Sequence, residues 1–556
     1  MLNAVEKVGE NKDKLFNFRP AFFAAICLIF GILFGYYNIV CDVSAWWLLC
    51  AIPILATPLF FHAGKRDLFV RGVTVLLLAS TFFLGFSCFR YQLYDYTRCG
   101  YYNGEYTVTG TVVSYVENGS SVTVVLKDVN VDGNEEEGRL KAYLPSSYAG
   151  ETRIADVVVI EGRVRTDTTY LKDYFKASAV NAKATYTMDN VTACQKVGRS
   201  KDVFLCIRDR VEKVIVSGMD KTSAAITLGV LTGDDTKIDG GLLYNMRMGG
   251  VAHIFAVSGL HVGALYGFVV LLFTKTRLRK TNPVLQFIVL AFVLLFYAAI
   301  CGFSASILRA TILCLVGYCM RKLGGAADNL NILGVAAIVI LLLTPCALFE
   351  VGFQLSFTAC LGIVLFAKRI GYVWDEAYKL YRKRFPRKYT DEEKKMLEKG
   401  DTLPPTIGER AYRSVASVAS ASLAAQVCTA PLQYMAFGYL SGWSFLLNLF
   451  FVPLLGAVFT VLLLCVFVAC LLPLWCSSYL LYIPAMIWNA ILLVFEVVDF
   501  STFALKDMQL SAGSCVCYYG GVIFLTDKWN ISKRQKLCLS AVCFTAFFII
   551  LALLNV

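Results

Sequence analysis

The stretch MRMGGVAHIFAVSGLHVG, residues 246–263, carries two of the chain's three histidines, His253 and His261, into an apolar run that extends to residue 273. Ionisable groups inside a segment of hydrocarbon length are costly and usually functional. At about 100° per residue, His253, Ser258 and His261 fall within an arc of roughly 140° on one helix. We therefore expect a membrane helix whose His/Ser face borders a hydrated cavity.

The same helix carries a second face made of glycines. Gly259, Gly263 and Gly267 repeat at intervals of four residues and therefore share one side. Stripes of small residues let membrane helices approach each other closely. We expect this stripe to pack against a neighbouring helix.

The composition indicates a membrane protein with many spans. Of the 556 residues, 57% are hydrophobic and 17% are charged, with a mean hydropathy of +0.62. At about 20 residues per span, candidate spans lie at 20–38, 46–61, 71–89, 251–273, 283–301, 303–320, 329–346, 348–368, 411–430, 443–471, 477–500, 512–526 and 535–555. We predict a polytopic α-helical membrane protein with about 11–13 membrane segments, some of them candidates for re-entrant segments.

Basic clusters recur between these spans on one side of the membrane. They occur before the first span, at 65–71, 275–280, 321–322, throughout 368–410, and at 528–536. The positive-inside rule places all of them, with the N-terminus, in the cytoplasm. We expect a multi-pass membrane protein with the segment 91–200 outside.

The outer segment has the pattern of a small β domain. Five stretches with alternating β-branched and aromatic residues lie at 106–117, 121–133, 138–145, 156–165 and 181–188. Five short strands within about 100 residues suit a small Greek-key β-barrel of the OB type. Residues 101–190 contain nine Lys/Arg and thirteen Asp/Glu, which favours a scaffolding role over direct DNA binding.

Two cysteines flank this domain. Cys99 and Cys194 are the only cysteines of the outer segment, whereas most of the others lie inside apolar spans. They either form a disulfide that closes the domain or remain two thiols at the membrane surface.

Five motifs in a fixed order suggest a family. They are GVLTGDD (229–235), MRMGGVAHIFAVSGLHVG (246–263), FSASILRA (303–310), FEVGFQLSF (349–357) and TAPLQYMAFGYLSGWSFLLNLFFVPL (429–454). Together they resemble the ComEC-type competence channels over about residues 200–470. The three N-terminal helices and the outer OB-like domain are also placed as in that family.

The resemblance implies a channel in the cytoplasmic membrane of a bacterium, which passes single-stranded DNA across that membrane during natural transformation. It implies an outer DNA receptor and a cytoplasmic ATPase motor as partners, besides the membrane lipids. Fuller family members carry a C-terminal metallo-β-lactamase-like domain, and no histidine follows His261 here. We therefore expect no metal site, cofactor or catalytic residue; either a separate nuclease degrades the other strand or the sequence is truncated.

These inferences divide the chain into five expected parts. They are three N-terminal transmembrane helices (1–90), the extracytoplasmic OB-like domain (91–200), interfacial amphipathic helices (201–250), a channel core with a cytoplasmic loop at 370–408 (251–500), and C-terminal transmembrane helices (501–556). For residues 202–218, a helix packed on the barrel is the alternative to an interfacial helix.

A buried charge lies within FSASILRA. Arg309 must face water or a partner, because a charge at the centre of a span costs roughly 2.5–3.5 kcal/mol on insertion scales. It either lines the DNA path together with Ser306, one turn earlier, or forms an ion pair with Glu350. Glu350 would repel a polyanion, so pairing or gating suits it, while Gln354 is a second polar candidate for the path.

A further wall of the path is expected near two prolines. Gln433 and Asn448 flank Pro431 and Pro453, where we expect broken helices. Unwound backbone is tolerated at membrane depth only where it lines a cavity or is buried in protein.

Two other functions fit parts of the pattern. A serine protease would need a base oriented toward Ser258, but His261 points parallel to it on the same helix. A small-solute or ion transporter with broken helices is the main alternative, although no internal repeat is visible in the sequence.

Overall fold

The structure is a computed structural model. It describes residues 19–41, 68–98, 100–118, 121–148, 152–166, 177–182, 184–233, 237–251, 253, 259–276, 282–322, 328–386, 405–498, 500–506, 508–526 and 532–554. The chain forms two compact units. The larger unit contains Phe18–Gln354 and Val452–Ser501, and the smaller unit contains Leu355–Phe451 and Thr502–Val556.

Apolar helices make up most of the larger unit. In chain order these are α2 (Pro20–Gly35), which continues as a π-helical turn to Val40, α4 (Leu68–Thr97), α6 (Val203–Gly218), α7 (Lys221–Thr232), α8 (Gly240–Met248), α10 (Gly259–Lys275), α11 (Pro283–Ile300), α12 (Ala305–Lys322), α13 (Asn329–Leu343), the part of α17 (Ser444–Leu471) from Val452 onward, and α18 (Ser477–Val497). Helices α2 and α4 pack closely because Gly31 faces the carbonyl of Phe82 and Gly85 faces that of Leu28. A side chain at either glycine would separate the pair.

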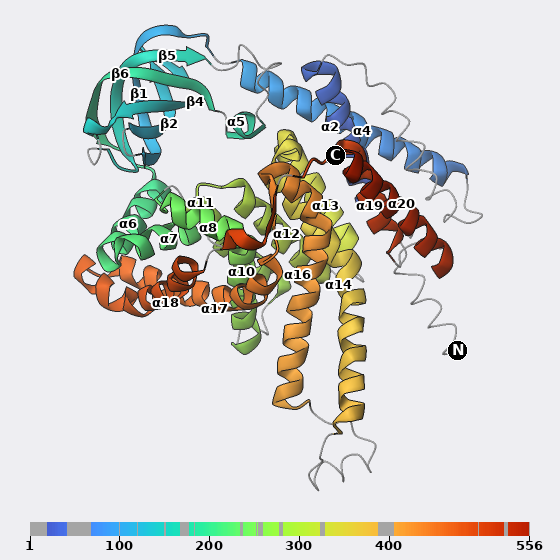
Figure 1. Ribbon diagram of the computed structural model, residues 1–556. Coiled ribbons are helices and arrows are strands. Elements are labelled where there is room, and N and C mark those ends of the chain that lie inside the picture. The colour runs from blue at the N-terminus through green and yellow to red at the C-terminus, as the bar shows by residue number, and fades with distance from the viewer. Residues whose placement is uncertain are drawn as a thin grey trace. The chain divides into compact units, whose positions relative to one another are not determined.

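One six-stranded sheet lies between α4 and α6 in the chain. Its strands are β1 (Asn103–Asn118), β2 (Ser121–Val131), β3 (Asn134–Glu136), β4 (Arg139–Pro145), β5 (Asp156–Thr166) and β6 (Ala184–Arg199). The order is β1-β5-β6-β4-β2-β3, and β1 also pairs with β2, so five strands form a closed ring of pairings. Within that ring only β4 and β6 are parallel. The strands curve around one interior (Figure 1).

The alternation of side chains explains this sheet. Val108, Val112, Leu126, Leu140 and Ile160 are fully buried in one core cluster, because alternate residues of each strand face inward. The turn between β2 and β3 has positive φ at Asp132 and Gly133, 48° and 94°, as a type I′ hairpin requires.

The fifth predicted strand needs a correction. The sequence pattern predicted a strand at 181–188, but Asn181 lies in the short helix α5 (Ala177–Ala182), and β6 runs from Ala184 to Arg199. A mixed segment of small and polar residues does not fix its own conformation; here the last strand is set by its pairing with β4 and β5.

The segment 201–250 forms three helices of different character. Helix α6 has mixed burial and begins at the N-cap Asp202, as its amphipathic pattern predicted. In α7 every residue from Ser223 to Thr232 is buried, so this helix is a core element and not the interfacial helix that we expected. Gly233 ends α7 with φ 83°, a left-handed conformation that favours glycine.

The smaller unit is built from long helices. Its elements are most of α14 (Val351–Arg384), α16 (Ile407–Phe437), the first residues of α17 (Ser444–Leu471), α19 (Ala512–Phe524), α20 (Lys533–Leu554) and the strand pair β7 (Tyr439–Ser441) and β8 (Ala504–Lys506). The expected loop at 370–408 is shorter than predicted, because α14 continues to Arg384 and α16 begins at Ile407.

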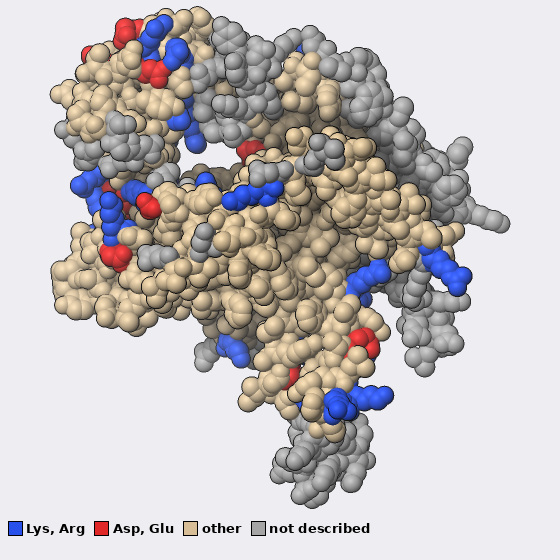
Figure 2. Space-filling view, in the orientation of Figure 1, with Lys and Arg blue, Asp and Glu red and all other residues tan. Residues whose placement is uncertain are grey.

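The helices have the length and composition of membrane spans. Among the described residues, eight helices are long and apolar enough to cross a bilayer, and three shorter apolar helices accompany them. On the face drawn in Figure 2, Lys, Arg, Asp and Glu gather on the sheet, on α6 and at one end of α14 and α16, and much of the remaining helical surface carries no charge. The protein is therefore mostly helical, with several long apolar helices compatible with a multi-pass membrane protein, and carries a separate β-sheet.

Candidate functional site

The buried arginine of the third motif lies at the start of α12. Arg309 is in the second turn of that helix and is 5% exposed. Glu350 lies between the 3-10 helix η5 (Pro345–Phe349) and α14. Arg309 Nη1 lies 4.0 Å from Glu350 Oε2, and the two side chains are 6% and 15% exposed. The two motifs FSASILRA and FEVGFQLSF thus place opposite charges side by side in a buried position.

A glycine makes room for this arginine. A Cβ placed on Gly352 would lie 3.2 Å from Arg309 Nη2, which is tighter than nine in ten real Cβ contacts. Gly352 therefore leaves space for the guanidinium of Arg309 next to Glu350.

Two amides extend the pair into a chain of hydrogen bonds. Asn181 Nδ2 donates to Glu350 Oε1 at 2.8 Å, and Gln92 Nε2 donates to Asn181 Oδ1 at 2.8 Å. The backbone N–H of Cys346 donates to Gln92 Oε1 at 2.9 Å. This series, here called the Arg309–Gln92 chain, joins α12, the start of α14, α5 and α4.

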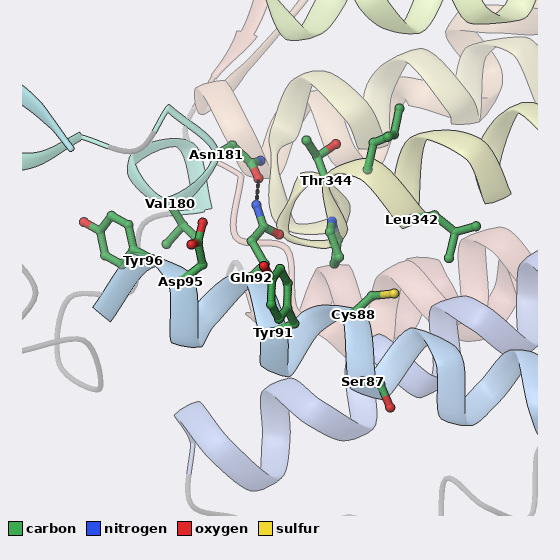
Figure 3. Close-up of a pocket in the computed structure, with 12 residues that line it drawn as sticks. Ser87, Cys88, Tyr91, Gln92, Asp95, Tyr96, Val180, Asn181, Leu342 and Thr344 are labelled. Atoms are coloured by element: carbon green, nitrogen blue, oxygen red, sulfur yellow. Dashed lines mark hydrogen bonds between the residues drawn. The ribbon is translucent and has the colours of Figure 1, made fainter. Parts of the chain in front are cut away.

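A cavity lies beside the Asn181 and Gln92 end of the Arg309–Gln92 chain. It has a volume of about 440 Å³, and its lining includes Tyr91, Gln92, Asp95, Asn181 and Thr344. Figure 3 shows the side chains of Gln92 and Asn181 meeting at its edge. The helix α5 therefore has open space next to the bond through which it contacts α4.

The histidines lie in two different environments. His253 is exposed, whereas His261 is 1% exposed and its ring centroid lies 4.6 Å from that of Phe459. The hydrated surroundings that we expected for His261 are thus not those of this conformation, because an apolar ring covers it. Ser258 lies outside the described residues.

The glycine stripe of α10 does not make the predicted close contact. Within the described chain, no atom lies within 4 Å of a Cβ placed on Gly263 or Gly267, and a Cβ on Gly259 would meet only Ala310 Cβ at an ordinary 3.5 Å. The spacing put the glycines on one face, and the end of that face at Gly259 lies next to the neighbouring helix α12.

The remaining candidates of the larger unit, Ser306 and Gln354, differ in role. Ser306 is half-buried one turn before Arg309. Gln354 Nε2 donates to the carbonyl of Leu348 at 3.0 Å, so it caps the end of η5. This amide is held by the backbone.

Gln433 and Asn448 belong to the smaller unit. Gln433 is half-buried, and Asn448 is 7% exposed with Nδ2 donating to Ser444 Oγ at 3.2 Å. Gln426 Nε2 donates to the same hydroxyl at 3.2 Å. A cavity that these amides share with Arg309 stays a prediction.

The predicted helix breaks at the two prolines are wrong. Helix α16 runs through Pro431 and α17 runs through Pro453. A proline removes the hydrogen bond to the carbonyl four residues earlier, which for Pro431 is that of Val427. The hydroxyl of Tyr518 donates to this carbonyl at 2.8 Å, and that of Tyr519 donates to the carbonyl of Cys428 at 2.9 Å. Side chains of α19 therefore take the place of the lost backbone donor.

Polar contacts fasten α6 to the sheet. Tyr115 donates to Glu212 at 2.8 Å, and Lys237 pairs with the same carboxylate. Burial lowers the pKa of Lys237, but the hydrogen bond and charge of Glu212 outweigh it and hold that pKa above its usual value. These groups are therefore engaged within the protein.

The carboxylate of Glu136 joins β3 to β6 and to the residues just before β1. Glu136 accepts hydrogen bonds from Tyr186, from Tyr102 at 2.7 Å and from the N–H of Gly100 at 3.2 Å. Burial raises the pKa of Glu136, but these hydrogen bonds outweigh it and leave the pKa below its usual value of 4.5.

The expected disulfide stays a prediction. Cys194 lies on β6 opposite Ile160, and Cys99 lies outside the described residues.

Sequence reasoning missed the two amides of the Arg309–Gln92 chain. Gln92 is a polar residue near the end of a long apolar helix, which is a usable signal. Asn181 gave no such signal, because it lies in a segment read as a strand.

Two of the comparisons with known proteins point to one family. The family described as "Competence protein" matches residues 230–532, more than half of the chain. A stretch of 180 residues is 28% identical to ComE operon protein 3 of Bacillus subtilis, covering 32% of this chain and 23% of that protein. A stretch of 120 residues is 33% identical to an uncharacterized protein of Mycoplasma pneumoniae, covering 21% of this chain and 28% of that protein. The matched stretches span about a quarter of each relative's length. No solved structure shows a significant match.

Proposed function

Because the chain belongs to the competence protein family, we propose that it passes one strand of DNA across the cytoplasmic membrane during natural transformation. The family expected from the ordered motifs is thus confirmed. The matched region contains Arg309 and Glu350, and the similarity to ComE operon protein 3 supports a role in competence.

The observation that carries the proposal is that Arg309 is buried in a protein built mostly from apolar helices. A guanidinium offers several donors in a planar fork and suits phosphate oxygens. In this conformation Glu350 lies next to it at 4.0 Å. We propose that this is a closed arrangement, in which Glu350 occupies the place that a phosphate takes during transport.

We propose that the sheet is an OB-like barrel. Its ring of five strands with one parallel pair, β4 and β6, suits a small closed barrel. Lys127 and Tyr115 contact Asp202 and Glu212 of the α6 region, so we assign the barrel a positioning role. Through Asn181 of α5 it holds the carboxylate that faces Arg309.

We assign the two sides of the membrane from the positions of the basic clusters. We place the N-terminus and the end of α14 in the cytoplasm and the sheet outside. The starts of α12 and α14 and the end of α4 then lie toward the outer face, where an incoming strand meets Arg309 first. We further propose that an outer DNA receptor, a cytoplasmic ATPase motor and a nuclease for the other strand act with this chain, and we assign it no catalytic step.

The test is uptake of labelled DNA by a strain that lacks its own competence channel and carries this chain. Arg309→Gln should abolish or strongly reduce cytoplasmic single-stranded DNA while the protein still inserts in the membrane. Arg321→Gln, an exposed position on the same helix, is the matched control and should transport normally. Normal uptake by the Arg309 variant would refute the role of this residue.

A further inference from the structure

Two helices of the smaller unit are longer than a bilayer requires. Helix α14 has 34 residues and α16 has 31, whereas about 20 residues cross the hydrocarbon. Arg369 Nη1 donates to the carbonyl of Leu525, just past the end of α19, and thus marks where the neighbouring span ends. The part of α14 after Arg369 therefore extends beyond the membrane, alongside the start of α16 (Figure 1).

A row of aromatic rings follows this extension. The ring of Tyr412 on α16 stacks on that of Tyr378 at 4.7 Å, Tyr381 follows Tyr378 at 6.3 Å, and Phe385 follows Tyr381 at 5.1 Å. The hydroxyl of Tyr412 also donates to the carbonyl of Trp374 at 2.7 Å. The last two rings are uncovered, with Tyr381 55% and Phe385 58% exposed.

Cations border the exposed rings. Arg382 lies 5.2 Å from the centre of the Tyr378 ring, and its Nε donates to the Tyr378 hydroxyl at 2.7 Å. Lys383 and Arg384 are exposed next to it. Residues 368–386 and 405–413 together hold eight Lys/Arg and three Asp/Glu, and Figure 2 shows Lys and Arg at this end of the pair.

The position of the rings argues against a membrane anchor. Tyr381 and Phe385 lie 12 and 16 residues after Arg369, which is roughly 18 and 24 Å along the helix. The headgroup region extends only about 5–8 Å beyond the hydrocarbon. The rings therefore lie past the lipid interface, in water, where exposed aromatic faces next to cations suit a polyanion with accessible bases.

We propose that Tyr381 and Phe385, with Arg382, Lys383 and Arg384, form a binding strip for single-stranded DNA on the cytoplasmic side. This inference rests on the proposed function, since the strip receives the strand as it leaves the channel. Two bases stack on the two exposed rings, and the three cations contact the phosphates between and beside them. A duplex cannot use the rings because its bases are already stacked.

The experiment measures binding of fluorescein-labelled (dT)15 to the full-length protein in phosphatidylcholine nanodiscs, by fluorescence anisotropy. The double variant Tyr381→Ala/Phe385→Ala should weaken binding about a hundredfold, because it removes two stacked bases and each contributes about tenfold. Arg384→Gln should lower the slope of log affinity against log salt by about 0.7, the value for one phosphate contact to a single strand.

Controls separate stacking from damage to the helix. Val373→Ala/Leu380→Ala removes two exposed apolar side chains, 65% and 69% exposed, from a different face of α14, and should bind like the wild type. Tyr381→Phe/Phe385→Tyr keeps both rings and should also bind like the wild type. A 15-base-pair duplex should bind more weakly than (dT)15.

The outcomes distinguish the strip from the channel. If the alanine variant binds (dT)15 like the wild type, the strip is refuted. This holds even if the variant lowers DNA uptake in cells, because a lost contact with a protein partner would also lower uptake. If Arg309→Gln then still abolishes uptake, the channel stands without it. If the alanine variant loses (dT)15 binding but the wild-type chain transports no DNA in cells, the channel is refuted and the strip stands.

Discussion

Replacing Glu350 by Gln should destabilise the larger unit, because it removes the negative charge next to a buried guanidinium. Two unit charges at the observed 4.0 Å interact by roughly 4 kcal/mol at an effective dielectric constant of about 20. Breaking a buried pair by removing one partner costs about 3–5 kcal/mol. The Gln amide still offers an oxygen to Asn181, so the hydrogen bond is kept in part. We expect a loss of about 3 kcal/mol.

A double-mutant cycle separates the pair from its surroundings. Glu350→Gln, Arg309→Gln and the double variant are purified in full length and unfolded by increasing SDS in mixed micelles. The double variant should be less destabilised than the sum of the single variants, with a coupling of about 2 kcal/mol or more. Such a coupling would assign the effect to the contact between the two charges.

An exposed ion pair provides the control. Glu376→Gln breaks the pair of Glu376 with Lys379, whose side chains are 43% and 68% exposed, and should leave the stability close to that of the wild type. The reasoning is refuted if Glu350→Gln lies within about 0.5 kcal/mol of the wild type, or if the two single effects add without coupling.

Three further predictions concern other parts of the chain. Tyr518→Phe should cost about 1–2 kcal/mol in the same unfolding assay. When Pro431 is replaced by Ala the cost should be much smaller, because the backbone N–H at position 431 can then donate to the carbonyl of Val427. Equal costs in both backgrounds would contradict this prediction. The pKa of Glu136 lies below its usual 4.5, so its stabilising contribution is present above that pH and is lost as the pH falls through the lowered pKa. Hydrogen exchange in the strands, corrected for intrinsic rates, should accelerate below about pH 4.5 in the wild type and depend less on pH in Glu136→Gln; identical profiles would argue against it. If Cys99 and Cys194 are bridged, both should resist alkylation until reductant is added, and full alkylation without reductant would exclude the bond.

The membrane helices could be predicted closely from hydropathy. The runs at 283–301 and 477–500 correspond to α11 and α18 within a few residues, because apolar composition over about 20 residues decides the span. The alternation in the outer segment likewise gave four strands in place. These features depend on local sequence alone.

The errors arose where distant residues decide the outcome. Pro431 stays inside a helix because Tyr518, which lies far along the chain, supplies the missing donor. Asn181 is helical and contacts Glu350, which no local pattern shows. His261 was placed correctly on α10, but its cover by Phe459 depends on how two helices pack. The Arg309–Glu350 proximity could be anticipated because two buried opposite charges have few other ways to be compensated.

The most direct test of the channel places a photo-crosslinking amino acid at Ser306, one turn from Arg309, in cells that are taking up labelled DNA. The account predicts a crosslink to the transported strand at Ser306 and none at Phe292, which is 68% exposed on α11. Uptake of labelled DNA at the normal rate without any crosslink at Ser306 would contradict the account, because the strand would then follow another path.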